Sequence, residues 1–400
     1  MSEMKQNSNK KRVVVAMSGG VDSSVAAALL VEQGYDVVGM MMRLWSEPGI
    51  GPAAPANRCC TPDQMADARR VAGLLGIPFY VVDVQDHFRQ TIVQFFIDEH
   101  ANGRTPNPCI ECNRQIRFTY LLERALALDA NYLATGHYAQ VVHTPDGYQL
   151  RKGLDPNKDQ SYVLHVLDQE KLGQVLFPIG GYTKPEVREL AQKFGLPVAS
   201  KSESQDLCFL GDGDYRRFLQ EYSQKASQPG PILTSSGEEL GQHEGLPFYT
   251  IGQRKGLGIS ASVPLFVLRK DVARNALIVG PKSELGQQIL IARDVNWLSG
   301  RPPQEPIPAQ IKIRYKAKGI QGMVVDLGNG RSQVTFHEPV FGVTAGQGAV
   351  FYDGDVCLGG GIIADGVNLL EDTATSADSV QAVTAQTTPS LQLADIQVHS

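Results

Sequence analysis

The strongest constraint on the fold of this chain is the alternation of short apolar runs with stretches of helical period over its first two hundred residues. Such alternation is typical of a parallel sheet with helices on both faces. The strands are expected over residues 13–17, 36–44, 79–84 and 132–135, and the main helices over 25–34, 62–76, 85–100 and 116–127. We therefore predict an α/β fold that opens with a doubly wound, parallel-sheet domain.

The composition changes after about residue 210, where glycine and proline become dense and helical period becomes scarce. From Ile289 onward, short strands are separated by turn dipeptides such as Asn329-Gly330 and Asp353-Gly354, which predicts a small antiparallel β-barrel. The last thirty residues hold four acids but no Lys or Arg, which is typical of a disordered tail. The predicted segments are an N-terminal extension (1–12), the doubly wound domain (13–210), a central domain (211–286), the barrel (287–370) and the tail (371–400).

Charge and hydropathy exclude two classes of protein. The chain has 37 Lys and Arg against 42 Asp and Glu, and this formal charge of −5 argues against a protein that coats nucleic acid non-specifically. Any contact with a polyanion must therefore be local. No apolar run approaches the roughly 18 residues of a membrane span, and the polar N-terminus does not fit a signal peptide. We expect a cytoplasmic protein with no membrane partner.

The motif SGGVDSS, Ser18 to Ser24, lies between the first expected strand and the first expected helix. A glycine pair in this place lets backbone N–H groups approach an anion, and the helix N-terminus adds its positive end. The serines add hydroxyl donors, and Asp22 can hold a magnesium ion bound to phosphates. A Walker loop needs a lysine beside Ser or Thr, and this motif has none. SGGxDSS instead resembles the loop of the ATP pyrophosphatases, which cleave ATP between the α and β phosphates and adenylate a carbonyl oxygen.

Six cysteines, at positions 59, 60, 109, 112, 208 and 357, are too sparse for a disulfide scaffold. Cys109 and Cys112 form a C-x-x-C in the stretch Thr105–Arg114, which its two prolines predict to be a loop. Zinc needs a second ligand pair at similar spacing, and the chain has none. Cys357 is expected in the barrel core. Cys208 lies at the expected domain boundary, where a loop can bring it over the nucleotide.

Two separate thiols near an adenylating loop indicate sulfur transfer. A persulfide on one cysteine can attack an activated carbon, and the other cysteine can resolve the resulting disulfide.

Six segments together resemble one family. They are AMSGGVDSSVAA (16–27), TPNPCIECNRQIRF (105–118), ATGHYA (134–139), KDQSY (158–162), SQDLCF (204–209) and GLPFYTIGQRKGLGI (245–259). The chain is similar to the tRNA-uridine 2-sulfurtransferases over residues 13–365. The resemblance implies ATP-dependent conversion of the wobble uridine of tRNA to 2-thiouridine, through an adenylated uridine and a cysteine persulfide.

The resemblance also implies roles for residues. Cys112 would be the nucleophile, Cys208 would carry the persulfide, and the two would form a transient disulfide. The ATP-binding residues would be Ala16, Met17, Ser18, Gly19, Gly20, Val21, Asp22, Ser23, Met42 and Gly136. The tRNA-binding residues would be Asn107, Pro108, Cys109, His137, Lys158, Asp159, Gln160, Arg314, Tyr315 and Gln347. On the sequence alone, a capping or packing role fits His137 equally well.

Cys109 departs from the family pattern, because many members carry an aspartate there with a proton-transfer role. A thiol has a higher pKa than a carboxyl group and is a weaker proton acceptor while protonated. Either that role is dispensable, or Cys109, Cys112 and Cys208 together ligate an iron-sulfur cluster with one open iron. The iron content of protein purified without oxygen distinguishes the two.

A cationic run offers a place for RNA. Alternate positions of AQIKIRYKAKGI are basic, and on a strand all would point to one face: Lys312, Arg314, Lys316 and Lys318. No acid occurs from Pro306 to Val325, which favours phosphate contact over the alternative of an edge strand protected by lysines. A second expected cationic cluster flanks the C-x-x-C and consists of Arg104, Arg114 and Arg117.

Two rival functions fit part of this pattern. An amide-forming adenylase that uses ammonia, like other ATP pyrophosphatases, would be indifferent to changes at Cys112 and Cys208. A nucleotide-gated tRNA-binding module would release no pyrophosphate when tRNA is added. For the sulfurtransferase, the expected partners are tRNA and a persulfide-donating protein, such as a cysteine desulfurase or a sulfur carrier. Its expected cofactors are ATP and Mg²⁺.

Overall fold

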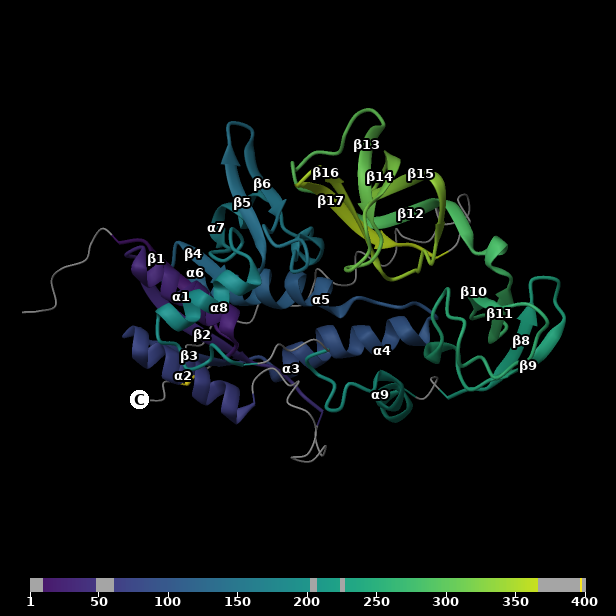
Figure 1. Cartoon of the computed structure of the whole chain (residues 1–400), viewed down its shortest axis with the longest axis horizontal. Coiled ribbons are helices and arrows are strands. Elements are labelled where there is room, and N and C mark those ends of the chain that lie inside the picture. Colours follow the sequence, from purple (N-terminus) through teal and green to yellow (C-terminus); the bar gives the residue numbers. More distant parts are fainter. Residues whose placement is uncertain (1–9, 48–60, 202–206, 224–226, 366–395, 398–400) are drawn as a thin grey trace, which may run out of the picture.

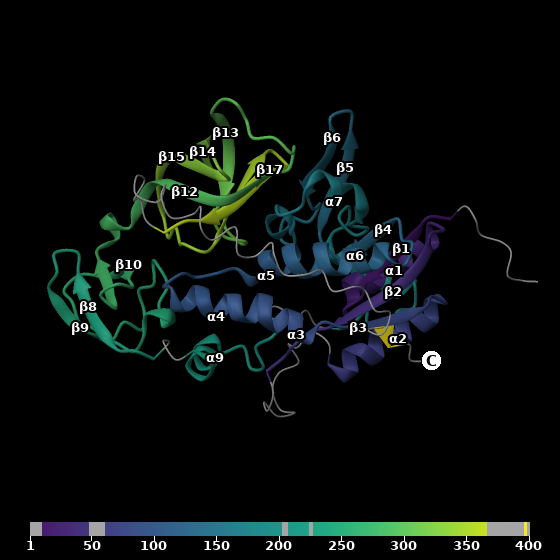
Figure 2. The same cartoon turned by 180° about the vertical axis from the view of Figure 1, so that it is seen from behind.

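Three sheets organise the chain in the computed structural model, which describes residues 10–47, 61–201, 207–223, 227–365 and 396–397. The first and second sheets lie at opposite ends of the molecule, and the barrel lies to one side of the long helices between them (Figures 1 and 2). Cys59, Cys60, residues 204–206 of SQDLCF, and most of the predicted N-terminal extension and tail lie outside the described residues. Within the described ranges we find no helix with the length and apolar character that a membrane crossing requires.

The first sheet is parallel and confirms the predicted α/β fold. Its strands are β1 Arg12–Ala16, β2 Asp36–Arg43, β3 Phe79–Asp83, β4 Tyr132–Thr135 and β7 Val175–Leu176, with β18 Ile396–Gln397 antiparallel to β3 at the edge. The strand order is β18-β3-β2-β1-β4-β7. The central strand β1 carries Val13, Val14 and Val15, all fully buried, as expected where helices cover both faces.

Helices cover both faces of this sheet. The helices of this part of the chain are α1 Val21–Glu32, α2 Pro62–Leu75, α3 Gln85–Phe88, η1 Arg89–Val93, α4 Gln94–Ala101, α5 Pro108–Glu111, η2 Cys112–Leu121, α6 Leu122–Leu126, η3 Ser161–Leu164, α7 Gln169–Gln174 and α8 Lys184–Lys193. Val13 and Val15 share an apolar cluster with α1, α2 and α8, whereas Val14 shares one with α4, η2 and α6. Because the strand order reverses at β1, the carboxyl ends of β1 and β4 mark the switch point where doubly wound sheets bind ligands.

The prediction of a loop over Thr105–Arg114 holds for residues 105–107 and is wrong from Pro108 onward. A continuous helix runs through α5, η2 and α6, and it begins at Pro108. Proline is tolerated in the first helical turn because the N–H that it lacks has no helical partner there. Asn107 caps this helix, since its Oδ1 accepts a hydrogen bond from the Cys109 amide at 3.1 Å. The C-x-x-C therefore lies at the start of a helix.

The second sheet is small and mixed, with the order β10-β11-β8-β9. Its strands are β8 Gly230–Thr234, β9 Glu239–His243, β10 Phe266–Asp271 and β11 Ala276–Gly280, with α9 Tyr215–Tyr222 before them and η4 Leu246–Phe248 between β9 and β10. β8 and β11 pair in parallel, and the remaining pairs are antiparallel.

The third sheet closes into the predicted antiparallel barrel. After the turn η5 Lys282–Glu284, its strands are β12 Gly286–Trp297, β13 Ile307–Lys312, β14 Ile320–Gly328, β15 Arg331–Phe341, β16 Gly348–Asp353 and β17 Val356–Ile363. Closure occurs because β12 pairs with both β15 and β17. A hairpin from the first half of the chain, β5 Ala139–Thr144 and β6 Gly147–Lys152, extends the barrel sheet where Leu150 pairs with Cys357. Cys357 is buried, as predicted.

The prediction that the cationic run shares one strand face is wrong. β13 ends at Lys312, and a turn follows before β14 because these two strands pair antiparallel. Lys312 is mostly buried and pairs with Asp159 at 3.4 Å. The remaining cations are exposed on the turn: Arg314, Lys316 and Lys318. The alternation of apolar and basic residues predicts one continuous strand here, but the chain reverses direction after Lys312.

A lysine of the second sheet buries its amine near His100 of α4. The Nζ of Lys270 in β10 and the Nδ1 of His100 in α4 are buried without a hydrogen-bond partner in the described part of the chain. Burial lowers the pKa of Lys270 to about 7, opposed in part by Asp365, and lowers the pKa of His100 to about 3. Both groups therefore bind protons less readily in the folded protein than in the unfolded chain.

Replacing Lys270 with methionine is expected to raise the melting temperature, and to raise it more at pH 7 than at pH 10. The unfolded chain keeps the ordinary lysine pKa of 10.5, so Lys270 must lose a proton on folding between about pH 7 and 10.5, and this cost grows as the pH falls. Methionine removes the cost and keeps the packing of the stem. Thermal unfolding should show a gain of about 2 °C or more at pH 7. A larger gain at pH 10 than at pH 7 would contradict this account.

Candidate active site

The SGGVDSS motif follows β1, as predicted, but α1 begins at Val21, so that within the motif only Ser18, Gly19 and Gly20 form the loop. The Ser23 hydroxyl accepts a hydrogen bond from the Ser18 amide at 3.1 Å, and the Ser24 hydroxyl donates to the Gly20 carbonyl at 2.8 Å. Gly19 has a φ of +70°, and a Cβ there would lie 2.2 Å from the carbonyl oxygen of Gln64 in α2. The backbone of the loop is therefore fixed against α2, and position 19 requires glycine.

Gly136 packs against this loop from the end of β4. A Cβ on Gly136 would lie 2.7 Å from the Ser23 amide nitrogen and 2.8 Å from the Asp22 carbonyl carbon. Met42, near the end of β2, is buried at the same carboxyl edge of the sheet. The structure therefore brings the loop and Gly136 into contact and places Met42 at their edge of the sheet.

Two residues that sequence reasoning missed hold Asp22. The Nζ of Lys184, the first residue of α8, lies 2.7 and 2.9 Å from the two carboxylate oxygens of Asp22. The Tyr138 hydroxyl donates to Asp22 Oδ1 at 2.7 Å. Lys201 adds a hydrogen bond to the Gly19 carbonyl at 3.0 Å. One sequence signal could have pointed to Lys184. A cation in the first turn of a helix is disfavoured by the helix macrodipole, so a lysine there suggests a specific acidic partner.

Cys109 and Cys112 differ in exposure on the same helix. Cys109 is exposed, whereas Cys112 is only 7% exposed. The helix beside Cys112 is anchored by Asn113, which is fully buried and donates through Nδ2 to the Val163 carbonyl at 3.0 Å. Arg117 donates to Asn113 Oδ1 at 2.8 Å. These contacts fix the backbone that carries Cys112.

The barrel closes on the start of this helix. The Thr105 amide donates to the Ala345 carbonyl at 2.9 Å, and Gln347 Nε2 donates to the Thr105 carbonyl at 2.8 Å. A Cβ on Gly348 would lie 2.9 Å from Ile110 Cδ1, which shows how closely the two segments pack. Gln347 therefore joins the barrel to the segment that carries Asn107, Pro108 and Cys109.

Cys208 lies in a β-turn in which the Leu210 amide donates to the Leu207 carbonyl at 3.1 Å. It is half-buried and packs against the same apolar cluster that contains Cys112. Over the described ranges, no three His, Cys, Asp or Glu side chains are grouped so that they could hold a metal ion. Cys109, Cys112 and Cys208 therefore do not form a ligand set for an iron-sulfur cluster in this conformation.

The predicted tRNA-contacting run 158–160 is engaged inside the protein. Asp159 is buried and accepts from the amides of Gly153 and Ser161 at 3.2 and 3.0 Å. Gln160 Oε1 accepts from the Tyr138 amide at 3.0 Å. Lys158, next to them, is half-buried. The run therefore links the hairpin, η3 and the barrel.

His137 lies in the core, directly after Gly136 at the end of β4. It is 7% exposed, its Nδ1 lies 2.7 Å from Thr135 Oγ1, and its ring packs near Phe118 and Phe177. Burial, and secondarily Arg117, lowers the pKa of His137 well below its ordinary value. This environment favours the packing role over direct contact with tRNA.

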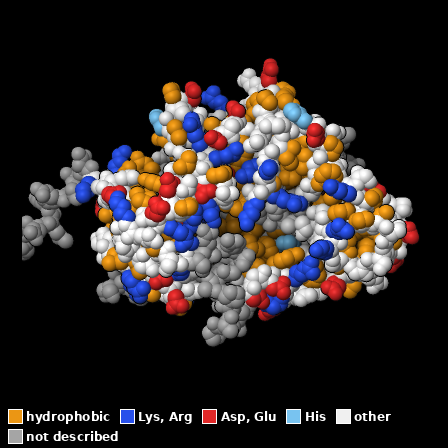
Figure 3. Space-filling view, in the orientation of Figure 1, with side chains coloured by type: hydrophobic (Ala, Val, Ile, Leu, Met, Phe, Trp, Pro, Cys, Tyr) orange, Lys and Arg blue, Asp and Glu red, His pale blue; other side chains and the backbone are white. Residues whose placement is uncertain are grey.

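Cationic side chains gather across the middle of the face shown in Figure 3. The turn after β13 presents the exposed Lys316 and Lys318, and Arg314 fixes it to the barrel by donating to the Gly342 carbonyl at 2.7 Å. The ring centroid of Tyr315 lies 6.2 Å from that of Tyr162, whose hydroxyl donates to the Gly348 carbonyl at 3.0 Å. This turn therefore adjoins the contact between the barrel and the Cys112 helix.

The arginines around the C-x-x-C have partners within the protein. Arg104 pairs with Glu99 at 2.7 Å and with Asp365 at 2.6 Å. Arg114 lies 3.5 Å from Glu111, and Arg117 binds Asn113. The Arg114 and Arg117 contacts lie within the helix itself, whereas Arg104 links the end of α4 to Asp365 after the barrel.

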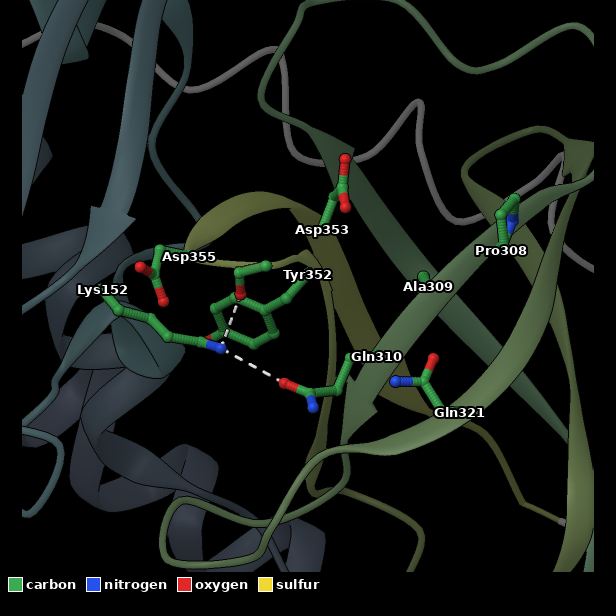
Figure 4. A pocket seen from close by; sticks show the side chains of 9 residues that line it. Lys152, Pro308, Ala309, Gln310, Gln321, Tyr352, Asp353 and Asp355 are labelled. Atoms are coloured by element: carbon green, nitrogen blue, oxygen red, sulfur yellow. Dashed lines mark hydrogen bonds between the residues drawn. The ribbon is translucent and has the colours of Figure 1, made fainter.

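A cavity of about 370 Å³ lies where Lys152 of β6 meets the barrel (Figure 4). Lys152 Nζ donates to Gln310 Oε1 at 3.2 Å and to the Gly354 carbonyl at 2.8 Å, and it lies 4.7 Å from the ring centroid of Tyr352. The lining contains none of the residues that the sequence predicts for the site. The cavity lies at the contact between the β5–β6 hairpin and the barrel.

Three family models match the chain in succession. They are described as the tRNA methyl transferase HUP domain over residues 11–212, the tRNA methyl transferase PRC-barrel domain over 216–281 and the aminomethyltransferase beta-barrel domain over 287–363. The first of these models covers the parallel strands of the first sheet and the segments that carry Cys109, Cys112 and Cys208.

Three curated relatives, each named tRNA-specific 2-thiouridylase MnmA, match nearly the whole chain. The protein of Heliobacterium modesticaldum is 46% identical over 364 residues, which are 90% of this chain and 94% of the relative. That of Magnetococcus marinus is 49% identical over 88% of this chain and 99% of the relative. That of Geotalea uraniireducens is 48% identical over 91% of this chain and 98% of the relative.

Proposed function

The chain belongs to the tRNA-specific 2-thiouridylase family, and from this premise we propose that it uses ATP and a cysteine persulfide to convert a wobble uridine of tRNA to 2-thiouridine. The observation that carries the proposal is the Cys112 helix. It is anchored in the α/β domain through Asn113 and held by the barrel through Thr105. The Cys112 helix thus connects the α/β domain, whose loop we assign to ATP, with the barrel, which carries exposed cations.

ATP would bind at the SGGVDSS loop, with Gly136 at its side. The fixed backbone and the serine hydroxyls suit the phosphates, and the N-terminus of α1 favours their negative charge. Asp22 has the hard oxygen ligands that Mg²⁺ prefers, but Lys184 binds both of them in this structure, so the ion would have to replace that amine. When bound with the nucleotide, the ion would neutralise phosphate charge. The uridine O2 attacks the α-phosphorus of ATP, pyrophosphate leaves, and the C2 carbon becomes activated by its bond to AMP.

Sulfur transfer follows in two steps that balance. The terminal sulfur of the Cys208 persulfide attacks C2 and AMP leaves with the bonding electrons, so that tRNA and Cys208 are joined by a disulfide. The Cys112 thiolate then attacks the Cys208 sulfur, forms the Cys112–Cys208 disulfide and releases the thiocarbonyl on the base. A dithiol reductant must supply two electrons to restore both thiols. A cysteine desulfurase or a sulfur carrier would then reload the sulfane sulfur.

This scheme routes no step through an iron-sulfur cluster, because Cys109, Cys112 and Cys208 are not gathered into a ligand set. Cys109 is exposed one residue beyond Pro108, where it would meet the target base. The proton-transfer role that an aspartate holds in many family members is then dispensable in this chain.

Changing Lys316 and Lys318 together to glutamate is expected to weaken tRNA binding, because both cations are exposed on the turn after β13. The loss should be about tenfold near 0.1 M salt, and the slope of log K against log salt should become shallower by about one per lysine. Filter binding over a salt series measures both. Lys193→Glu, at an exposed position on α8, is the control and should change neither quantity. If the double variant bound tRNA with unchanged affinity at low salt, the turn would not be part of the tRNA-binding site.

Release of pyrophosphate on addition of unmodified tRNA tests the proposal against its rivals. We expect release that depends on ATP and tRNA together. A tRNA-binding module would release none. An ammonia-using adenylase would release pyrophosphate, introduce nitrogen, and keep its activity when Cys112 or Cys208 is replaced.

A further inference from the structure

Glu47 is a buried carboxylate that the sulfur-transfer scheme does not use. Its side chain is 1% exposed. Arg217 of α9 donates from Nη1 to Oε1 and from Nη2 to Oε2, each at 2.7 Å. A forked pair of this kind is geometrically specific, and loss of one partner leaves a buried charge uncompensated. The Glu47 side chain is therefore held in one position.

The same residue binds the chain just beyond Cys208. The Gly211 amide donates to Glu47 Oε2 at 3.3 Å, and the Glu47 amide donates to the Phe209 carbonyl at 3.4 Å. Arg217 also donates through Nε to Asp212 at 2.7 Å. The hydrogen bonds of Glu47 and Asp212 together raise the pKa of Arg217, so the guanidinium stays charged. The pair thus binds the chain at three residues after Cys208, namely Phe209, Gly211 and Asp212.

Apolar packing also fixes the turn. Phe209 is 1% exposed, and its ring centroid lies 5.3 Å from that of Phe96 in α4 and 5.6 Å from that of Phe218 in α9. Phe218 follows Arg217 directly, so α9 supplies both the apolar and the ionic partner. With Phe209 locked in the core, the half-buried Cys208 beside it has little freedom to move.

We propose that the Glu47–Arg217 pair positions the persulfide-bearing thiol. By fixing the β-turn over residues 207–210, it keeps Cys208 in place relative to Cys112 and the nucleotide loop. This inference rests on the proposed function, because that function assigns sulfur transfer to Cys208. The contacts of the pair lie on the Cys208 segment and α9. Its loss should therefore slow sulfur transfer and spare adenylation.

The variants Glu47→Gln and Arg217→Lys test the inference. With ATP, tRNA and a low-molecular-weight persulfide donor, formation of 2-thiouridine should fall about tenfold or more, because a small misplacement of a reacting group is costly. Pyrophosphate release with tRNA should stay within about twofold of wild type, since the loop is untouched. The alkylation rate of Cys208, followed by peptide mass spectrometry, should change as its turn loosens. Glu221→Gln is the matched control, because it removes a largely exposed partner of the same arginine, at 2.9 Å, and both reactions should stay within about twofold.

Equal loss of both reactions in the folded variants would overturn the inference, and so would unchanged thiolation. If Glu47→Gln does not fold, Arg217→Lys decides the question, since it keeps the charge and removes the fork. These outcomes can be distinguished from failure of the proposed function. In that case the wild-type enzyme itself would release pyrophosphate without forming 2-thiouridine.

Discussion

Replacing Cys208 with alanine is expected to abolish formation of 2-thiouridine while tRNA-dependent release of pyrophosphate continues. In the proposed order of steps, the uridine oxygen attacks ATP before any sulfur moves, so the thiol is needed only afterwards. Phe209 and the Glu47 contacts should hold the turn in the variant, because the change removes only one half-buried sulfur. Thiolation should fall by about a thousandfold or more, as expected when a reacting group is deleted.

Cys357→Ala is the matched control for this experiment. Cys357 is 1% exposed in the barrel sheet, and burial raises the pKa of its thiol, so it is an inert core residue. The variant should lose about 1 kcal/mol of stability and keep its thiolation activity. A Cys208→Ala enzyme that still thiolates tRNA from a persulfide donor would contradict the scheme.

The Cys112→Ala variant should stop the reaction one step later than Cys208→Ala. Its persulfide can still attack the activated carbon, but no thiolate remains to break the bond between tRNA and Cys208. We expect tRNA joined to the protein by a disulfide, which a thiol reductant releases as thiolated tRNA. Gel electrophoresis without reductant detects this species. If the disulfide-linked species did not form and thiolation were unchanged, Cys112 would have no role in the mechanism.

The second large effect is expected at the nucleotide loop, where Gly19→Ala should reduce pyrophosphate release about a hundredfold or more. Alanine is strained at a φ of +70°, and its Cβ would lie 2.2 Å from the Gln64 carbonyl oxygen, so either the loop or α2 must move. Movement of the loop misplaces Ser23 and Asp22 relative to the phosphates. Measurement of ATP binding and of pyrophosphate release follows the loss directly.

Gly34→Ala separates the clash from backbone strain. Gly34, two residues after α1, has a φ of +84°, but nothing lies within 4 Å of a Cβ built there. This variant should lose about 1 kcal/mol of stability, through strain alone, and keep normal pyrophosphate release. Equal loss of activity at positions 19 and 34 would show that general strain, and not the shape of the loop, is responsible.

The parallel sheet and its loop could be predicted because local patterns dictate them. The run Val13 to Val15 is apolar at every position, as a strand covered on both faces requires, and the glycines of SGGVDSS mark the turn that follows it. The barrel could be predicted from its turn dipeptides for the same reason. These features depend on residues close together in the sequence.

The remaining features were missed for two reasons: one local signal was misread, and the others depend on tertiary contacts. Pro108 opens a helix because Asn107 caps it, although proline in a sequence usually indicates a break. The cationic run bends after Lys312 because β14 must return along β13. Lys184 meets Asp22 from 162 residues away, and no spacing rule connects such partners. Contacts between residues far apart in the sequence, such as that of Lys184 with Asp22, were therefore the hardest to predict.

Mass spectrometry of tRNA nucleosides tests the central claim most directly. Purified enzyme is incubated with unmodified tRNA, ATP, Mg²⁺ and a persulfide donor, and the tRNA is digested to nucleosides. The account predicts 2-thiouridine among the nucleosides, formed only when ATP and the donor are both present, and absent with Cys208→Ala. Uridine left unchanged by active, ATP-consuming enzyme, or converted to a product without sulfur, would contradict it.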